Sequence, residues 1–167
     1  MAAAAIVFDF SELDLAAAQL QPLLDLDGTD DLMTSIGALG ESQTRRRITS
    51  EKTAPDGSAW APNLEGNSIL QRTGQNLLDS ITYEADANEA RWGATWEHAS
   101  VHQNGAVIKA KNGKLAFSIG GRSVFTDKVT IPARQFVGIS SNNKSEIEDL
   151  VTDFVGELTA GIGGGRR

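Results

Sequence analysis

The chain contains no cysteine, so its 167 residues can form no disulfide, thiolate nucleophile or cysteine-ligated zinc site. It also contains no stretch near the ~20 apolar residues that a membrane-spanning helix requires. Its apolar start, Met1 to Phe10, lacks the positively charged region that opens a signal peptide. We therefore expect a soluble protein of a reducing cytoplasm with no membrane partner.

Positive charge is scarce as well. Fifteen Lys and Arg face twenty-two Asp and Glu, which gives a net charge of −7. This balance argues against a body that grips nucleic acid through its phosphates, although an acidic surface can line a channel through which DNA slides without adhering. With 40% apolar and 22% charged residues, the chain is predicted to fold as one domain.

Catalytic motifs are missing too. There is no Gly-x-Ser-x-Gly elbow, and the glycine run at 161–165 lacks the Lys-Ser/Thr of a phosphate-binding loop. His98 and His102 have the helical spacing of zinc ligands, but Glu97 lies outside the pair and no third ligand is evident. Packing beside Trp96 is the more typical role of such histidines. The sequence predicts no enzyme and no cofactor; a small metal-dependent hydrolase is the least favoured hypothesis, to be tested by metal analysis.

Periodicity predicts an α+β fold in which antiparallel hairpins pack against N-terminal helices and a C-terminal amphipathic helix. The predicted elements are a strand at 6–10, helices at 11–21 and 29–48, a short helix after Thr73, a hairpin of 81–85 with 90–95, and a short helix at 96–103 ended by Asn104-Gly105. Thr29 is expected to cap the second helix. A capping box at Asn143–Glu146 is expected to begin the last helix, which packs on the sheet. The domain is expected to span 1–160, before a flexible Gly/Arg tail at 161–167.

Two glycines within a predicted helix and one turn segment interrupt the predicted helices and strands. Gly37 and Gly40 weaken the helix at 29–48 by about 1 kcal/mol each relative to alanine if exposed, or else allow another backbone to come close. The segment 54–60, Ala-Pro-Asp-Gly-Ser-Ala-Trp, has the residues of a tight turn, after which Trp60 returns to the core.

The region 106–131 is predicted to form an arm that projects toward a neighbouring subunit. Residues 107–111 and 114–119 are expected to pair around a type I′ turn at Asn112-Gly113, and a further strand, 124–131, ends before Pro132. The arm carries several lysines, Lys109, Lys111, Lys114 and Lys128. Lysines on an exposed sheet edge also serve simply to deter aggregation.

Arginines cluster at two places, Arg45–Arg47 and Arg166–Arg167. The first cluster lies near a predicted helix C-terminus, where cations are favoured, and adjacent helical positions splay around the helix. We interpret it as a solvated face or a subunit contact. The alternative is a DNA-binding or packaging accessory factor whose DNA-facing residues are Arg45, Arg46, Arg47, Arg166 and Arg167.

Four stretches together resemble the phage virion morphogenesis family of Mu-like tail-completion and head–tail joining proteins. They are Arg45–Ile48 with Pro55–Trp60, Leu70–Gly74 with Leu77–Leu78 and Ser80–Ile81, Glu97–Gly105, and Val129–Gly138. The chain departs from that pattern at Ala99, where a tyrosine is frequent, and at Gln135, where a second proline is common. The resemblance implies a small α+β structural protein of the virion neck. Such a protein, assembled in the host cytoplasm, would form a ring, expected to be hexameric, that completes or terminates the tail and joins it to the head.

The partners implied by this resemblance are further copies of the chain, other neck or tail proteins (tail tube, stopper or portal adaptor), and DNA that passes through the lumen without specific binding. The candidate docking residues are Lys109, Asn112, Gly113, Lys114, Phe125, Arg134 and Phe136. Fold-internal roles are the alternative: Trp60 and Phe136 in the core, Arg134 in a salt bridge at a sheet edge, and Asn112-Gly113 as only a turn. We favour the core for Trp60 and the interface for the hairpin.

Overall fold

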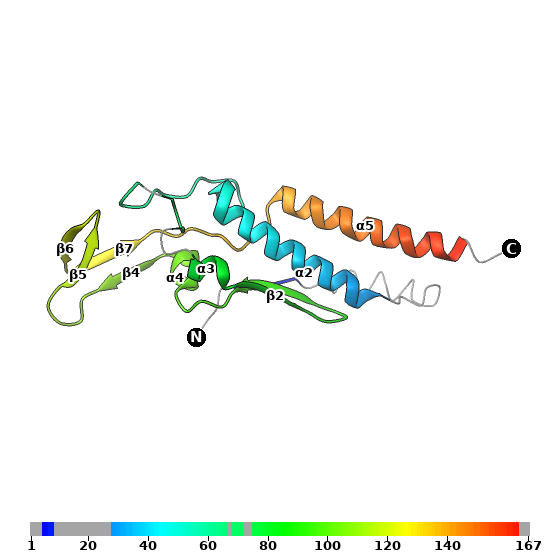
Figure 1. Cartoon of the computed structure of the whole chain (residues 1–167), viewed down its shortest axis with the longest axis horizontal. Coiled ribbons are helices and arrows are strands. Elements are labelled where there is room, and N and C mark those ends of the chain that lie inside the picture. The colour runs from blue at the N-terminus through cyan, green and yellow to red at the C-terminus, as the bar shows by residue number, and fades with distance from the viewer. Residues whose placement is uncertain (1–4, 9–27, 67, 72–74, 164–167) are drawn as a thin grey trace.

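The computed structural model describes residues 5–8, 28–66, 68–71 and 75–163. It is an elongated α+β structure, which confirms the predicted fold class (Figure 1). The elements, in chain order, are β1 (Ala5–Phe8), α2 (Thr29–Arg46), the π-helical turn η1 (Arg47–Glu51), α3 (Gln75–Asp79), β2 (Ile81–Ala85), β3 (Ala90–Ala94), α4 (Ala99–Asn104), β4 (Ala106–Lys109), β5 (Leu115–Ile119), β6 (Arg122–Thr126), β7 (Lys128–Ile131) and α5 (Ser141–Gly163). The helix expected at 11–21 and the Thr73 cap lie outside the described residues.

The centre of the molecule is the antiparallel sheet β1-β3-β2 with α2 packed on it. The hairpin register matches the predicted alternation, because Ile81 lies opposite Ala94 and Tyr83 opposite Trp92. Ile81 and Trp92 are buried with Ile36 of α2. The period-two pattern of this hairpin therefore identified its buried face correctly.

Gly37 and Gly40 are the reason that α2 can lie so close to this sheet. A Cβ at Gly37 would be 2.5 Å from the Tyr83 ring, and one at Gly40 would be 2.4 Å from the Trp92 ring. The close approach that the glycines allow is therefore to two aromatic rings rather than to another backbone. Both glycines are buried, so their cost in helix propensity is offset by this packing.

The N-terminal end of α2 differs from the prediction, whereas its C-terminal end agrees with it. Gly28, in a left-handed conformation with φ +101°, occupies the N-cap, and no side chain caps the helix, so the prediction that Thr29 is the cap is wrong. A glycine fits there because the position needs positive φ. The predicted continuation past Arg45 is confirmed, since α2 leads directly into η1.

α5 begins earlier than its sequence pattern suggested. The Ser140 Oγ accepts a hydrogen bond from the Asn143 N–H, and the Asn143 Oδ1 accepts one from the Ser140 N–H, both at 3.2 Å. This is a reciprocal capping box one turn ahead of the expected Asn143–Glu146 box. Glu146 is free to bond elsewhere for that reason. The helix continues to Gly163, two residues beyond the expected start of the tail at 161.

α5 packs mainly along α2, in the opposite direction (Figure 1). Near one end, the Gln43 Nε2 donates to the Glu146 Oε2 at 2.7 Å, and near the other, Phe154 lies against Gly28. Ile147 is buried between these points. The C-terminal helix thus covers α2, which in turn covers the sheet.

The arm has a different strand pairing from the one predicted. β4 pairs with β7, and β5 pairs with β6 around Gly120-Gly121, so the expected hairpin around Asn112-Gly113 is wrong. Both turn glycines have positive φ, +55° and +80°, as a two-residue type I′ turn requires. Asn112 does not have positive φ, which leaves the Asn-Gly pair in an open loop between β4 and β5. β7 ends at Ile131, before Pro132, as predicted.

The turn at 54–60 forms as its residues predict. The Asp56 Oδ1 accepts hydrogen bonds from the Ser58 N–H (2.9 Å) and hydroxyl (2.6 Å), and Gly57 has φ +85°. These bonds lower the pKa of Asp56. Trp60 is buried, which confirms its expected place in the core. Gly105, after α4, has positive φ but extended ψ, so it ends the helix without the αL conformation expected there.

Candidate docking surface and the segment behind it

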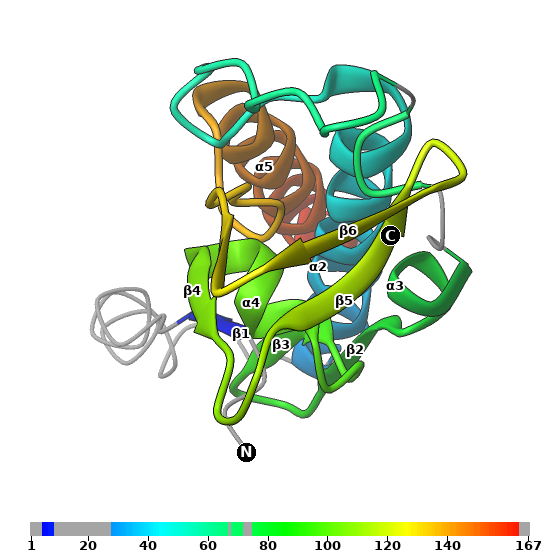
Figure 2. The same ribbon diagram turned by 90° about the vertical axis from the view of Figure 1, so that its left-hand side faces the viewer.

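The arm lies at one end of the elongated molecule, away from the C-terminal end of α5 (Figure 1). Viewed onto that end, the β5–β6 hairpin crosses in front of α2 and α4 (Figure 2). Its turn is tied to the body, because the Gly120 N–H donates to the Glu65 Oε1 at 2.8 Å. Lys109, Asn112, Gly113, Lys114 and Phe125, five of the predicted docking residues, are all exposed on the arm.

The two faces of the β5–β6 hairpin are unlike each other. Residues turned inward, Leu115, Phe117, Ile119 and Val124, are half-buried, whereas the opposite face bears small residues around Phe125. Phe125 lies across from Ala116 and is 65% exposed. It therefore stands alone as an aromatic ring directed away from the fold, and large exposed apolar side chains of this kind are common at protein–protein contacts.

The β4–β7 ladder adds cations to the same end. Lys109 lies directly opposite Lys128, a like-charge pair that disfavours the ladder unless an anion is nearby. On β4, Val107 (58% exposed) and Ile108 are also open to solvent. Among the described residues, none of the arm's five cations, Lys109, Lys111, Lys114, Arg122 and Lys128, takes part in a salt bridge. This end is thus basic and partly apolar.

Arg134 and Phe136 lie elsewhere, in the interior of the molecule. Phe136 is completely buried, and Arg134 donates hydrogen bonds to the carbonyls of Ala61 (3.0 Å) and Pro62 (3.1 Å). Burial lowers the pKa of Arg134. The structure gives Arg134 backbone carbonyls as partners, instead of the salt bridge considered from the sequence. Within this chain, both side chains therefore have fold-internal partners.

The extended segment 134–138 that carries them is held by side chains in place of a neighbouring strand. The Gln103 Oε1 accepts hydrogen bonds from the N–H groups of Phe136 (3.0 Å) and Val137 (3.1 Å), and its Nε2 donates to the Val137 carbonyl at 2.8 Å. One glutamine thus supplies three bonds that a paired strand would otherwise make. In addition, the Arg134 N–H donates to the His102 carbonyl at 2.7 Å.

Arg47 holds the same segment from the other side. Its Nη1 donates to the carbonyls of Phe136 (3.2 Å) and Gly138 (2.7 Å), its Nη2 donates to the Asn143 Oδ1, and its Nε lies 3.7 Å from a Glu51 carboxylate oxygen. The residue is 0% exposed. Burial lowers the pKa of Arg47, and the nearby Glu51 carboxylate opposes that shift. A planar guanidinium can join three acceptors in this way, whereas a lysine ammonium could not.

The other two arginines of the cluster also bond within the chain. Arg45 donates to the carbonyls of Leu78 (2.6 Å) and Ile81 (2.8 Å), and Arg46 pairs with Glu51 and Glu146. The prediction of a solvated face at 45–47 is therefore wrong for the buried Arg47, whereas the side chains of Arg45 and Arg46 remain 38% and 41% exposed. Arg166 and Arg167 lie outside the described residues.

His98 and His102 both pack on Trp96. The His102 ring stacks on the indole with centroids 5.7 Å apart, and His98 meets it edge-on at 5.1 Å. Burial lowers the pKa of His102, with Arg134 and His98 acting in the same direction. Within the part of the chain that the structure describes, no three His, Asp or Glu side chains are placed to hold a metal ion.

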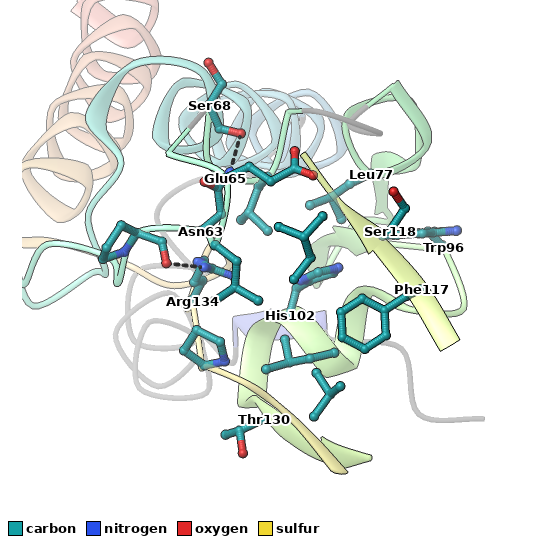
Figure 3. Close-up of a pocket in the computed structure, with 17 residues that line it drawn as sticks. Asn63, Glu65, Ser68, Leu77, Trp96, His102, Phe117, Ser118, Thr130 and Arg134 are labelled. Atoms are coloured by element: carbon teal, nitrogen blue, oxygen red, sulfur yellow. Dashed lines mark hydrogen bonds between the residues drawn. The ribbon is translucent and has the colours of Figure 1, made fainter. Parts of the chain in front are cut away.

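His102 and Trp96 line a pocket of about 380 Å³ beneath the β5–β6 hairpin (Figure 3). Phe117 enters it from the hairpin, Leu77 from α3 and Arg134 from the segment after β7. Its lining is mostly apolar. The pocket separates the inner face of the arm from the body.

Among the described residues, no helix is long and apolar enough to span a bilayer. Taken together, these residues form a small α+β fold with hydrogen-bonded interior arginines and an open basic surface at one end. The chain belongs to the phage virion morphogenesis family, whose model matches residues 8–156. It is a family of structural proteins and is generally non-enzymatic. No curated protein and no solved structure is similar enough to the chain to count as a match.

Sequence reasoning missed two parts of this arrangement. The bonding of Gln103 and the interior position of Arg47 depend on segments far apart in the chain, at separations of 34 and 91 residues. The available signal was helical spacing, which places Arg47 one turn after Thr44 and next to Ile48. Ile48 is apolar and Thr44 is one turn earlier, and both are buried, so the helix face toward Arg47 is an interior one.

Proposed function

We propose that this virion morphogenesis protein is a ring-forming component of the phage neck, assembled from six copies, which completes or terminates the tail and joins it to the head. The observation that carries the proposal is the family match over residues 8–156. The exposed basic end of the arm supports it, because a ring requires a patch that docks onto a different patch of the next copy. The partners on either side would be tail-tube, stopper or portal-adaptor proteins.

Charge is consistent with such a ring. At −7 for each copy, a hexamer would carry about six times that charge, which favours passage of a DNA duplex without adhesion. The proposal includes an acidic lumen. A map of the assembled ring with a basic lumen would contradict that part of it.

The alternative, a DNA-binding or packaging factor that acts through Arg45–Arg47, has less support. Arg47 is fully buried, and all three guanidinium groups have partners inside the chain. Binding to a DNA duplex whose affinity falls steeply with salt would favour this alternative. We expect no measurable binding at low salt.

Native mass spectrometry tests the proposal directly. The 17.7-kDa protein is measured alone and after mixing with tails that lack it. We expect a closed species of six copies, either alone or only on the tails, and restored joining of tails to heads. A strict monomer that ignores the tails would refute the proposal.

A further inference from the structure

The charge of the molecule is divided along its length. Residues 106–131, the arm, carry five cations and one carboxylate, a net charge of +4, so the rest of the chain carries −11. Phe125 is an exposed residue of this cationic arm, with Arg122 three residues before it in β6 and Lys128 three residues after it at the start of β7. The arm therefore offers an exposed aromatic ring on a segment of net positive charge.

A surface of complementary character lies between α2 and α5. Seven residues line an open hollow of about 330 Å³, called here the acidic groove: Asp31, Leu32, Ser35, Leu150, Asp153, Phe154 and Glu157. The lining combines three carboxylates, Asp31, Asp153 and Glu157, with three apolar side chains, Leu32, Leu150 and Phe154. At roughly 30 Å³ for each water, the hollow has room for about ten waters, ample space for one aromatic side chain.

The arm and the acidic groove cannot meet within one molecule. The groove lies along α5 and the first turns of α2, whereas β4 to β7 lie at the far end of the longest axis (Figure 1). A contact between them must therefore join two copies, with the arm of each on the groove of the next. Such a head-to-tail contact closes into a ring when the rotation between copies allows it.

We propose that the acidic groove is the receptor for the arm of a second copy, with Phe125 in the hollow and the arm's cations against Asp31, Asp153 and Glu157. The inference rests on the proposed ring and names its subunit contact. It also brings carboxylates of a second copy to Lys109 and Lys128, which lie directly opposite each other. Steering by opposite charges favours this docking over contact between two arms.

Another possible occupant is residues 9–27 of the same chain. That segment contains five carboxylates, at Asp9, Glu12, Asp14, Asp25 and Asp27, and no Lys or Arg. Its charge is therefore of the same sign as the rim of the groove, which disfavours it as an occupant. The arm has the opposite sign and an unburied aromatic ring.

Disulfide trapping is the decisive experiment, because the chain has no native cysteine to interfere. Phe125→Cys and Asp153→Cys, both at exposed positions, are made in separate copies with different mass tags and in one double variant. Mixed on tails and oxidised, the single variants should give a covalent dimer of one copy of each kind. The double variant should give a ladder that ends at the ring. Ala87→Cys, in the exposed β2–β3 turn, replaces either partner as the control and should give no dimer.

A charge exchange provides a second readout. Lys128→Glu or Asp153→Lys alone should weaken assembly at low salt at least ~10-fold, and combining them should recover most of that loss. Unfolding midpoints near that of the wild type show that the exposed substitutions leave the fold intact.

The outcomes separate the contact from the ring. Rings that form normally without a disulfide between positions 125 and 153, and charge reversals without effect or recovery, would overturn this contact and leave the ring in place. A cross-link from position 153 to a cysteine placed within 9–27 of the same copy would also overturn it. A protein that stays monomeric in the presence of tails would refute both the ring and the contact.

Discussion

Replacing Arg47 by alanine should destabilise the protein far more than the same change at its neighbour. The Arg47 guanidinium donates hydrogen bonds to the carbonyls of Phe136 and Gly138 and to the Asn143 Oδ1, and the substitution removes all of them. Because Arg47 is 0% exposed, water does not reach its side chain. Each acceptor that remains buried and unpaired costs about 1–3 kcal/mol.

We therefore expect Arg47→Ala to lower the free energy of unfolding by about 4 kcal/mol, a large part of the ~5–15 kcal/mol typical of a domain. For a chain of this size, that corresponds to a fall in Tm of roughly 10–15 °C. Arg47→Lys should retain part of the stability, since an ammonium can reach one or two of the three acceptors but cannot join them all.

Arg46→Ala is the matched control. Arg46 is the same residue type at the adjacent position, but its side chain is 41% exposed in its pairs with Glu51 and Glu146. Pairs of that exposure contribute about 0–1 kcal/mol. Urea unfolding of the two variants, followed by tryptophan fluorescence, measures the difference at unchanged m-value. If Arg47→Ala lowers the free energy of unfolding no more than Arg46→Ala does, the hydrogen bonds of Arg47 do not stabilise the interior as expected.

Three further predictions concern other contacts. Gly40→Ala places a methyl group against the indole ring packed there and should cost about 1–3 kcal/mol in thermal unfolding, whereas Gly156→Ala, with open space around it, should be neutral or stabilising. Gln103→Leu leaves three backbone groups without partners, so hydrogen exchange should show lost protection there and stability should fall by about 2–4 kcal/mol; unchanged protection would contradict this. Burial lowers the pKa of His102 below its unfolded value of ~6.5, so the stability held by the neutral imidazole is present above that pH and is lost as the pH falls through the folded pKa. His102→Gln should remove this part of the pH profile in urea titrations, whereas the control His98→Gln should leave most of it, because burial is the largest cause of the shift in the His102 pKa.

Local patterns predicted those elements whose stability depends on their own sequence. The alternation in 81–94 gave the central hairpin with its buried face, and the segment 54–60 gave the turn before Trp60. In these cases, each side chain is constrained mainly by its near neighbours. The α+β class followed for the same reason.

The arm shows where local reasoning was insufficient. The sequence predicted a hairpin turn at Asn112-Gly113, whereas the hairpin forms around Gly120-Gly121. Pairing β4 with β7 and β5 with β6 places Phe117 and Ile119 over the pocket beneath the hairpin. The position of the turn thus depends on which strand face is buried against the body. A local sequence pattern carries no information about that long-range contact.

The cap of α5 shows the same limit at a helix end. Two segments, Ser140–Asn143 and Asn143–Glu146, have the spacing of a capping box. The first is used because Asn143 also receives the Arg47 guanidinium and Glu146 binds Gln43. Contacts with residues about one hundred positions earlier therefore fix where the helix begins.

Three of the four stretches that resemble the family meet in the interior. They contribute Arg47 and Trp60, Gln103, and Phe136, and the side chains of Arg47 and Gln103 hold the segment 134–138. These residues of the resembling stretches thus hold the fold. Phe125 and the acidic groove residue Asp153 lie outside these stretches, on open surface. In a ring, the choice of neighbour must be made by such surface residues, so substitutions on the arm and in the groove should alter assembly without altering the fold.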